Sequence, residues 1–157
     1  MNKLVFGMDK GIARWVAERL PNIKTPENFG PYVAIGVADQ NERPLAGIVY
    51  NNFRAGERPI EVHVNIFAAS PRWAQRGVIH ALFHYPFEQL GVARITAHVA
   101  KKNKRARRAV RKLGFIEEGC MAQAFDGVND LCIYGLTKEN WLAGKFGSRQ
   151  EKLKEVA

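Results

Sequence analysis

The sequence has little cysteine and no long apolar run. Cys120 and Cys132 are its two cysteines, too few and too unpatterned for a disulfide framework or a zinc site. No apolar stretch approaches the roughly 20 residues of a membrane-spanning helix, so no membrane partner is expected. Residues 1–7 are followed at once by Asp9 and Lys10, so the long apolar region of a signal peptide is missing. A cytoplasmic protein is therefore predicted.

Acidic residues are scarce relative to basic ones. The 157 residues include 24 Lys and Arg against 15 Asp and Glu, a formal net charge of +9. Such a charge attracts nucleic acid, acidic proteins or anionic cofactors, and it says nothing about the fold. The 46% hydrophobic and 25% charged content is typical of a globular protein. We expect one domain over residues 1–145 and a charged C-terminal tail over residues 146–157.

A strand, a basic loop and a helix organise the middle of the chain. Residues 62–67 alternate apolar and polar side chains with the period of two that is typical of a strand. Pro71 ends this strand, because proline cannot donate to a ladder. The loop contains Gly77 and leads into a helix over residues 78–90, which Pro86 should kink or end. Free N–H groups and the dipole at the start of this helix predict an anion site.

The rest of the pattern predicts further strands and helices. Residues 39–44 are a polar turn, so the strands on either side are expected to form an antiparallel hairpin. The predicted strands are residues 4–6, 32–38, 45–53, 60–67, 93–100, 115–125 and 130–136, and the predicted helices are residues 8–20, 78–90 and a basic helix within 101–112. This order predicts an α/β protein whose mixed sheet carries helices on its faces.

Three segments stand out by their order and spacing. Residues 74–79 read Ala-Gln-Arg-Gly-Val-Ile after a proline, and residues 103–115 run from Asn-Lys-Arg-Ala to Lys-Leu-Gly-Phe. Together they resemble the phosphate loop and the second helix of the GNAT family of N-acetyltransferases, although Ile79 stands where the family prefers Gly or Ala. The tail from Glu118-Gly119 to Trp141 is similar to the RimJ/RimL-like branch, which acetylates protein N-termini. The resemblance covers roughly residues 30–142.

The resemblance implies a fold and a reaction. The expected fold is a GNAT-type mixed, mostly antiparallel central sheet with helices on both faces, splayed between the fourth and fifth strands. Acetyl-CoA would be the co-substrate, and its acetyl group would pass directly to a primary amine. A protein N-terminus is the favoured acceptor, with polyamines, amino sugars and small metabolites as alternatives. Many such domains pair through sheet edges or C-terminal strands, so a homodimer is compatible with the sequence.

The resemblance also assigns the acetyl-CoA site. The pantetheine arm is expected along the backbone of residues 67–69, where an N–H near Ala68 or Ala69 would polarise the thioester carbonyl. The pyrophosphate is expected on the N–H groups at the start of the following helix. Asn103 would contact the pantetheine arm and also cap its helix. The predicted acetyl-CoA-binding residues are Phe67, Ala68, Ala69, Gln75, Arg76, Gly77, Val78, Ile79, His80, Asn103 and Arg107.

The general base is expected on strand 60–67. Alternation puts Glu61, His63 and Asn65 on one face. His63 is the preferred base, because imidazole accepts a proton near pH 7. The alternative for His63 is a sheet histidine hydrogen-bonded to a neighbour, and Glu61 is the second candidate base.

The general acid has no clear candidate. Val110 stands where many members of the family carry a tyrosine, which leaves water, Tyr134 or Cys120. Cys120 could instead be a nucleophile, but a buried inert thiol is the commoner state of such a residue. His80 and His84 are spaced like a chelating pair on a helix, yet no third ligand accompanies them, so no metal is expected.

One run is strongly basic. Eight of the twelve residues over 101–112 are Lys or Arg. These charges could meet the phosphates of acetyl-CoA, dock onto nucleic acid, or simply be solvated. The alternative function is therefore a catalytically weak GNAT-like domain that binds nucleic acid or the ribosome through this basic helix.

Overall fold

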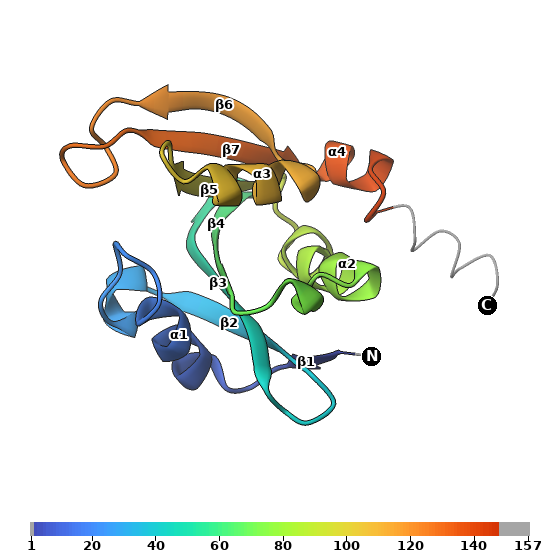
Figure 1. Cartoon of the computed structure of the whole chain (residues 1–157). Coiled ribbons are helices and arrows are strands. Elements are labelled where there is room, and N and C mark those ends of the chain that lie inside the picture. The colour runs from blue at the N-terminus through green and yellow to red at the C-terminus, as the bar shows by residue number, and fades with distance from the viewer. Residues whose placement is uncertain (1, 148–157) are drawn as a thin grey trace.

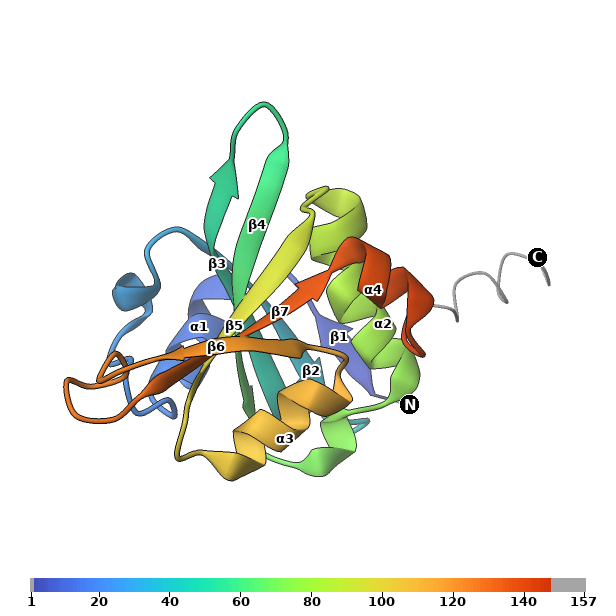
Figure 2. The same ribbon diagram turned by 90° about the horizontal axis from the view of Figure 1, so that it is seen from above.

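The computed structural model describes residues 2–147 of the chain. A seven-stranded sheet runs through this part in the order β1-β2-β3-β4-β5-β7-β6 (Figures 1 and 2). Its strands are β1 Lys3–Val5, β2 Tyr32–Ala38, β3 Pro44–Ala55, β4 Pro59–Ala68, β5 Arg94–Ala100, β6 Ile116–Met121 and β7 Leu131–Thr137. Its helices and helical turns are α1 Asp9–Ala17, η1 Pro26–Phe29, η2 Pro71–Trp73, α2 Arg76–His84, η3 Tyr85–Gln89, α3 Lys104–Lys112 and α4 Lys138–Ala143. Residues 148–157 of the predicted charged tail lie outside the described residues.

The two faces of the sheet carry different helices. Side chains of successive residues in a strand point to opposite faces of the sheet, so they belong to two different hydrophobic cores. Ile48 of β3 packs in the core under α2, η3 and α4, whereas Val49 packs with α1 and η1. Figure 1 shows α1 beside β2 and β3. This arrangement confirms the predicted mixed α/β sheet with helices on both faces.

The strands part in the middle of the sheet. β4 and β5 are parallel and pair only from Glu61↔Arg94 to His63↔Thr96, although β4 continues to Ala68. The other neighbouring strands pair in antiparallel fashion. Figure 1 shows the β1–β4 group and the β5-β7-β6 group diverging beyond this point. The predicted splay between the fourth and fifth strands is therefore confirmed.

Pro86 divides the helix that was predicted over residues 78–90. Regular α-helix ends at His84, and Pro86 lies in the π-helical turn η3, where the N–H of Leu90 reaches the carbonyl of Tyr85. A proline has no N–H to continue the α-helical ladder, so the wider turn absorbs the interruption. The prediction that Pro86 interrupts the helix is therefore confirmed, because the regular α-helix ends before it.

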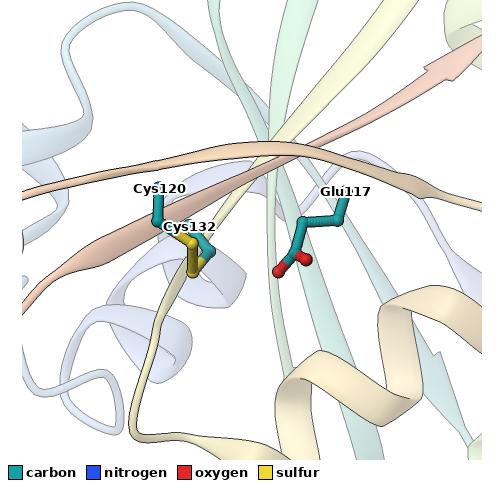
Figure 3. A group of neighbouring side chains, drawn as sticks. All are labelled: Glu117, Cys120 and Cys132. Atoms are coloured by element: carbon teal, nitrogen blue, oxygen red, sulfur yellow. A yellow bond between two sulfur atoms is a disulfide. The ribbon is translucent and has the colours of Figure 1, made fainter.

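The two cysteines are joined. Cys120 and Cys132 form a disulfide between β6 and β7, with Glu117 beside them (Figure 3). The pairing of β6 with β7 shifts between Glu117 and Gly119, and this bulge brings Cys120 directly opposite Cys132. The predictions of a free thiol are therefore wrong, whether as an inert buried group, a nucleophile or the general acid.

No helix in residues 2–147 is long and apolar enough to cross a membrane.

Candidate active site

The splay exposes one edge of β4. The N–H of Ala69 donates to the carbonyl of Leu45 at 2.8 Å, so it is already bound to β3. Backbone groups of a strand point alternately to its two neighbours. The N–H groups of Ala68 and Ile66 therefore point away from β3, toward a stretch of edge that lies beyond the last pair with β5, His63↔Thr96, and with which no strand of the described chain pairs. Of the two N–H groups predicted to polarise a carbonyl, only that of Ala68 is directed to the open edge.

The start of α2 supplies a second set of free donors. Gln75 precedes the helix and makes no side-chain cap to it. Within residues 2–147, the N–H groups of Arg76, Gly77 and Val78 have no hydrogen-bond acceptor, whereas Ile79 already bonds to the carbonyl of Gln75. These N–H groups and the positive end of the helix dipole fit the pyrophosphate of a nucleotide cofactor.

The N-terminal segment fastens this loop. The Gln75 side chain accepts a hydrogen bond from the N–H of Asn2 at 3.0 Å, and Asn2 Nδ2 donates to the carbonyl of Arg72 at 2.7 Å. The partners of these two contacts are 73 and 70 positions apart in the sequence. No local pattern around Gln75 predicts this contact.

Four predicted acetyl-CoA-binding side chains point elsewhere. Val78 and Ile79 are only 6% and 3% exposed in the core, so the Ile79 side chain does not narrow the loop. Arg76 donates through Nε and Nη2 to the carbonyl of Lys145, and His80 Nδ1 donates to the carbonyl of Phe146. Of these four residues, only Arg76 and Val78 can contribute to an anion site, and they do so through their unbonded backbone N–H groups.

In the segment over residues 103–115, Asn103 caps a helix and Arg107 binds the neighbouring strands. Asn103 Oδ1 accepts a hydrogen bond from the N–H of Ala106 at 3.1 Å, which confirms the predicted cap of α3. Arg107 instead lies against the sheet, where it donates to the Tyr134 hydroxyl at 2.9 Å and to Glu117 at 2.8 Å. These two hydrogen bonds raise the pKa of Arg107 above its ordinary value. Its guanidinium is thus turned toward β6 and β7 and not held out for a phosphate.

Charged side chains surround the point where β4 and β5 separate. Glu61 accepts hydrogen bonds from Thr96 Oγ1 at 2.9 Å and from Arg54 Nε at 3.2 Å. Burial by itself would raise the pKa of Glu61, but these two hydrogen bonds outweigh it and the pKa lies below its ordinary value. Arg94 Nε lies 3.4 Å from Glu61 Oε2, and the two Nη atoms of Arg94 form a bidentate ion pair with the Glu118 carboxylate. Both carboxylates are therefore ionised and paired with arginines.

Gly135 makes room for this ion pair. A Cβ at this position would lie 2.5 Å from Arg94 Nη2 and 2.6 Å from Glu118 Oε1. The absence of a side chain on β7 therefore lets the pair lie across the strand. Gly135 lies in the tail that resembles the RimJ/RimL-like branch, and the ion pair gives a physical reason for a glycine at this position.

His63 is held on both sides. Its Nδ1 lies 3.1 Å from Asn52 Nδ2, and its Nε2 lies 3.7 Å from Glu61 Oε1. Asn52 has a φ of 52° in a region where the pairing of β3 with β4 is irregular, and such a bulge re-aims a side chain. Burial is the largest cause that lowers the pKa of His63, and Glu61 partly opposes it. His63 is therefore a neutral ring at pH 7, hydrogen-bonded to a neighbour as the alternative prediction had it.

A second imidazole was missed in the sequence. The His98 ring lies 5.0 Å from the His63 ring in an edge-to-face contact across the splay. Strand alternation does place His98 on the face of Thr96, but only the parallel register of β4 and β5 brings that face beside His63. The site thus combines a free backbone edge, a helix start with unbonded N–H groups and two adjacent imidazoles. These are the parts needed to hold an acyl thioester and to deprotonate an amine.

Comparison with known proteins identifies the fold family. A family model described as an acetyltransferase (GNAT) domain matches residues 8–116. The structure of spermidine/spermine N-acetyltransferase SpeG from Vibrio cholerae aligns with a TM-score of 0.67 and 18% identity, over 90% of this chain and 95% of that one. The ribosomal-protein-S5-alanine acetyltransferase from Vibrio fischeri aligns with a TM-score of 0.64 and 16% identity, over 89% and 94%. No curated protein sequence matches the chain. The chain belongs to the GNAT family of acetyltransferases.

Proposed function

We propose that the chain transfers the acetyl group of acetyl-CoA to a primary amine, with a protein N-terminus as the acceptor. The observation that carries the proposal is the continuity of the donor site. The open edge of β4 ends at Ala68, and within eight residues the chain reaches the unbonded N–H groups at the start of α2. An extended arm that ends in a pyrophosphate fits this sequence of donors.

Each part of the site has a role in this reaction. Acetyl-CoA supplies an acyl group activated as a thioester. The N–H groups of Ile66 or Ala68 would donate to its carbonyl oxygen as negative charge develops there, an effect typically worth about 3–4 kcal/mol. The amine nitrogen forms a bond to the carbonyl carbon, the carbon–sulfur bond breaks, and an imidazole at the splay accepts the proton lost by the nitrogen. The free thiolate takes its proton from solvent.

The charges at the splay support a singly charged acceptor over a polyamine. Glu61 and Glu118 are each paired with arginine, so neither offers an unpaired negative charge. The chain as a whole carries a formal net charge of +9, which disfavours the approach of a polycation. Among the structural relatives, SpeG is named for spermidine and the Vibrio fischeri enzyme for an alanine of ribosomal protein S5. Because both carboxylates are already paired, the site favours a protein N-terminus over a polyamine as the acceptor.

Calorimetric titration with acetyl-CoA tests the donor site directly. We expect micromolar binding by the wild-type protein and at least tenfold weaker binding by Gly77→Asp, because a carboxylate at the second residue of α2 repels the pyrophosphate. Asp is favourable at a helix start, so this variant should remain folded.

The matched control is Gly77→Asn, which has nearly the same shape without the charge and should lose much less affinity. Equal affinities for Asp and Asn would place the pyrophosphate elsewhere. No binding by the wild-type protein at either of two salt concentrations would contradict the proposed function.

The basic helix supports a second candidate function, docking on a polyanion. Within the described chain, five cations of the run 101–112 make no salt bridge to a carboxylate: Lys102, Lys104, Arg105, Arg108 and Lys112. Arg107 and Arg111 are taken up by Glu117, so the exposed Arg105 and Arg108 are the residues to change.

Charge reversal on this helix is a prediction of the docking function. In a titration with a DNA duplex, Arg105→Glu/Arg108→Glu should bind at least tenfold more weakly and with a shallower salt dependence, because fewer phosphates are neutralised. A control with the same change of net charge, Arg43→Glu/Arg58→Glu on two exposed loops, should bind nearly as the wild type does. Equal losses for both pairs would mean that only net charge matters.

A further inference from the structure

We propose that His98 accepts the proton of the amine, and that His63 is a positioning residue that holds the His98 ring. This inference rests on the proposed function, which requires a base at the splay. It reverses the prediction from the sequence, in which His63 was the base. The argument depends on which imidazole nitrogen has a free lone pair.

The lone pair of His63 is already used. An amide NH2 group can only donate, so the contact of Asn52 Nδ2 with His63 Nδ1 makes Nδ1 the acceptor. The ring proton of His63 then lies on Nε2, which faces Glu61 Oε1 at 3.7 Å. Neither nitrogen of His63 is left to receive a proton from a substrate. The ring itself is fixed by Asn52 on one side and Glu61 on the other.

The lone pair of His98 is free. No hydrogen bond to the His98 ring is formed by any residue between 2 and 147. His98 lies on β5 two residues beyond Thr96, the last residue that pairs with β4, and it is exposed. Among the described residues, its one aromatic contact is the edge-to-face contact with the His63 ring at 5.0 Å. A substrate amine at the splay can therefore reach a nitrogen of His98.

The surroundings of His98 suit a base that gains a proton during the reaction. Although the residue is exposed, neighbouring groups partly remove water from its ring; this desolvation is the largest cause that lowers its pKa, and His63 lowers it further, so the ring is neutral at pH 7. Glu61 opposes these effects and would stabilise the charged ring. Arg94 on the same strand is occupied by Glu118 on β6, and the residue opposite His98 on β7 is Ile133, which does not titrate. The proton gained by His98 leaves to solvent through its exposed face.

The first experiment compares two glutamine variants in acetyl transfer to peptides with free N-termini. His98→Gln should lower kcat by about 100-fold, the low end of what a general base contributes, with unchanged affinity for acetyl-CoA. It should also lose the fall in rate that the wild type shows toward acid pH, whose midpoint should lie below the ordinary imidazole pKa of about 6.5 because the surroundings lower the pKa of His98. Added imidazole should restore part of the rate. His63→Gln should lower kcat by less than tenfold. The reverse order of the two variants would overturn the proposal.

A second experiment needs no substrate. In 15N-labelled protein, NMR should find His63 fixed with its proton on Nε2, and Asn52→Ala should release this preference. His98 should titrate without a fixed tautomer. A free Nδ1 on His63, or a hydrogen-bonded ring at His98, would overturn the proposal even if no acceptor peptide is found. A wild-type protein that binds acetyl-CoA but acetylates no amine would instead contradict the proposed function.

Discussion

The substitution Gly47→Val is expected to lower the free energy of unfolding by about 3 kcal/mol, the upper end of the usual cost of overpacking a core. Gly47 lies in β3 beneath α1. A Cβ at this position would overlap Val16 Cγ2 and would lie 3.2 Å from Trp15 Cε3. Val16 is fully buried, so it has no free space to move into. The helix would have to lift from the sheet.

Urea unfolding measures this effect, and α1 offers a control of opposite sign. Gly11 lies in the same helix with nothing within 4 Å of its Cβ position. Gly11→Ala should therefore stabilise the protein by about 0.5–1 kcal/mol through helix propensity. An unchanged midpoint for Gly47→Val would show that α1 does not pack on β3 as described.

Removal of the disulfide is expected to cost about 3 kcal/mol. Cys120 and Cys132 close a loop of 12 residues, and in the chain-entropy model a cross-link of this span restricts the unfolded chain by about this amount. Cys132 is fully buried, whereas Cys120 is exposed. The variant Cys120→Ser/Cys132→Ala therefore removes the bond without placing a hydroxyl group in the core.

Unfolding with and without a reducing agent distinguishes the bond from the side chains. The wild type should lose stability when reduced, and the double variant should unfold identically in both conditions. A wild type that is indifferent to reductant would mean that the two thiols are not joined in solution.

Local pattern was sufficient to predict most of the elements. The alternation in residues 62–67 predicted the core of β4, and the polar turn at residues 39–44 predicted the hairpin of β2 and β3. In that turn the Asp39 side chain accepts hydrogen bonds from the N–H groups of Asn41 and Arg43, which is a local property of the sequence. Pro86 similarly marked the end of regular helix in α2. These predictions rely on interactions between residues close in the chain.

Whether the two cysteines can form a disulfide depends on the register of β6 against β7. Cys120 and Glu117 are three residues apart, so simple alternation would put them on opposite faces of β6. The bulge between Glu117 and Gly119 inserts one extra residue and turns Cys120 toward Cys132. A bulge of this kind has no reliable sequence pattern, because it is set by the pairing with the neighbouring strand.

The sequence by itself determined the order of the elements, the unbonded N–H groups at the start of α2 and the cap at Asn103, because each depends on backbone groups within a few residues. Only the tertiary structure decided which groups are free to act. Arg107 is bound by Tyr134 and Glu117, and His63 is held by Asn52, a residue re-aimed by an irregular strand. His98 reaches the site because two parallel strands meet at Thr96 and then separate. The sequence states which chemical groups are present. Whether a lone pair or a charge is already bound by another residue depends on partners that only the folded chain brings together.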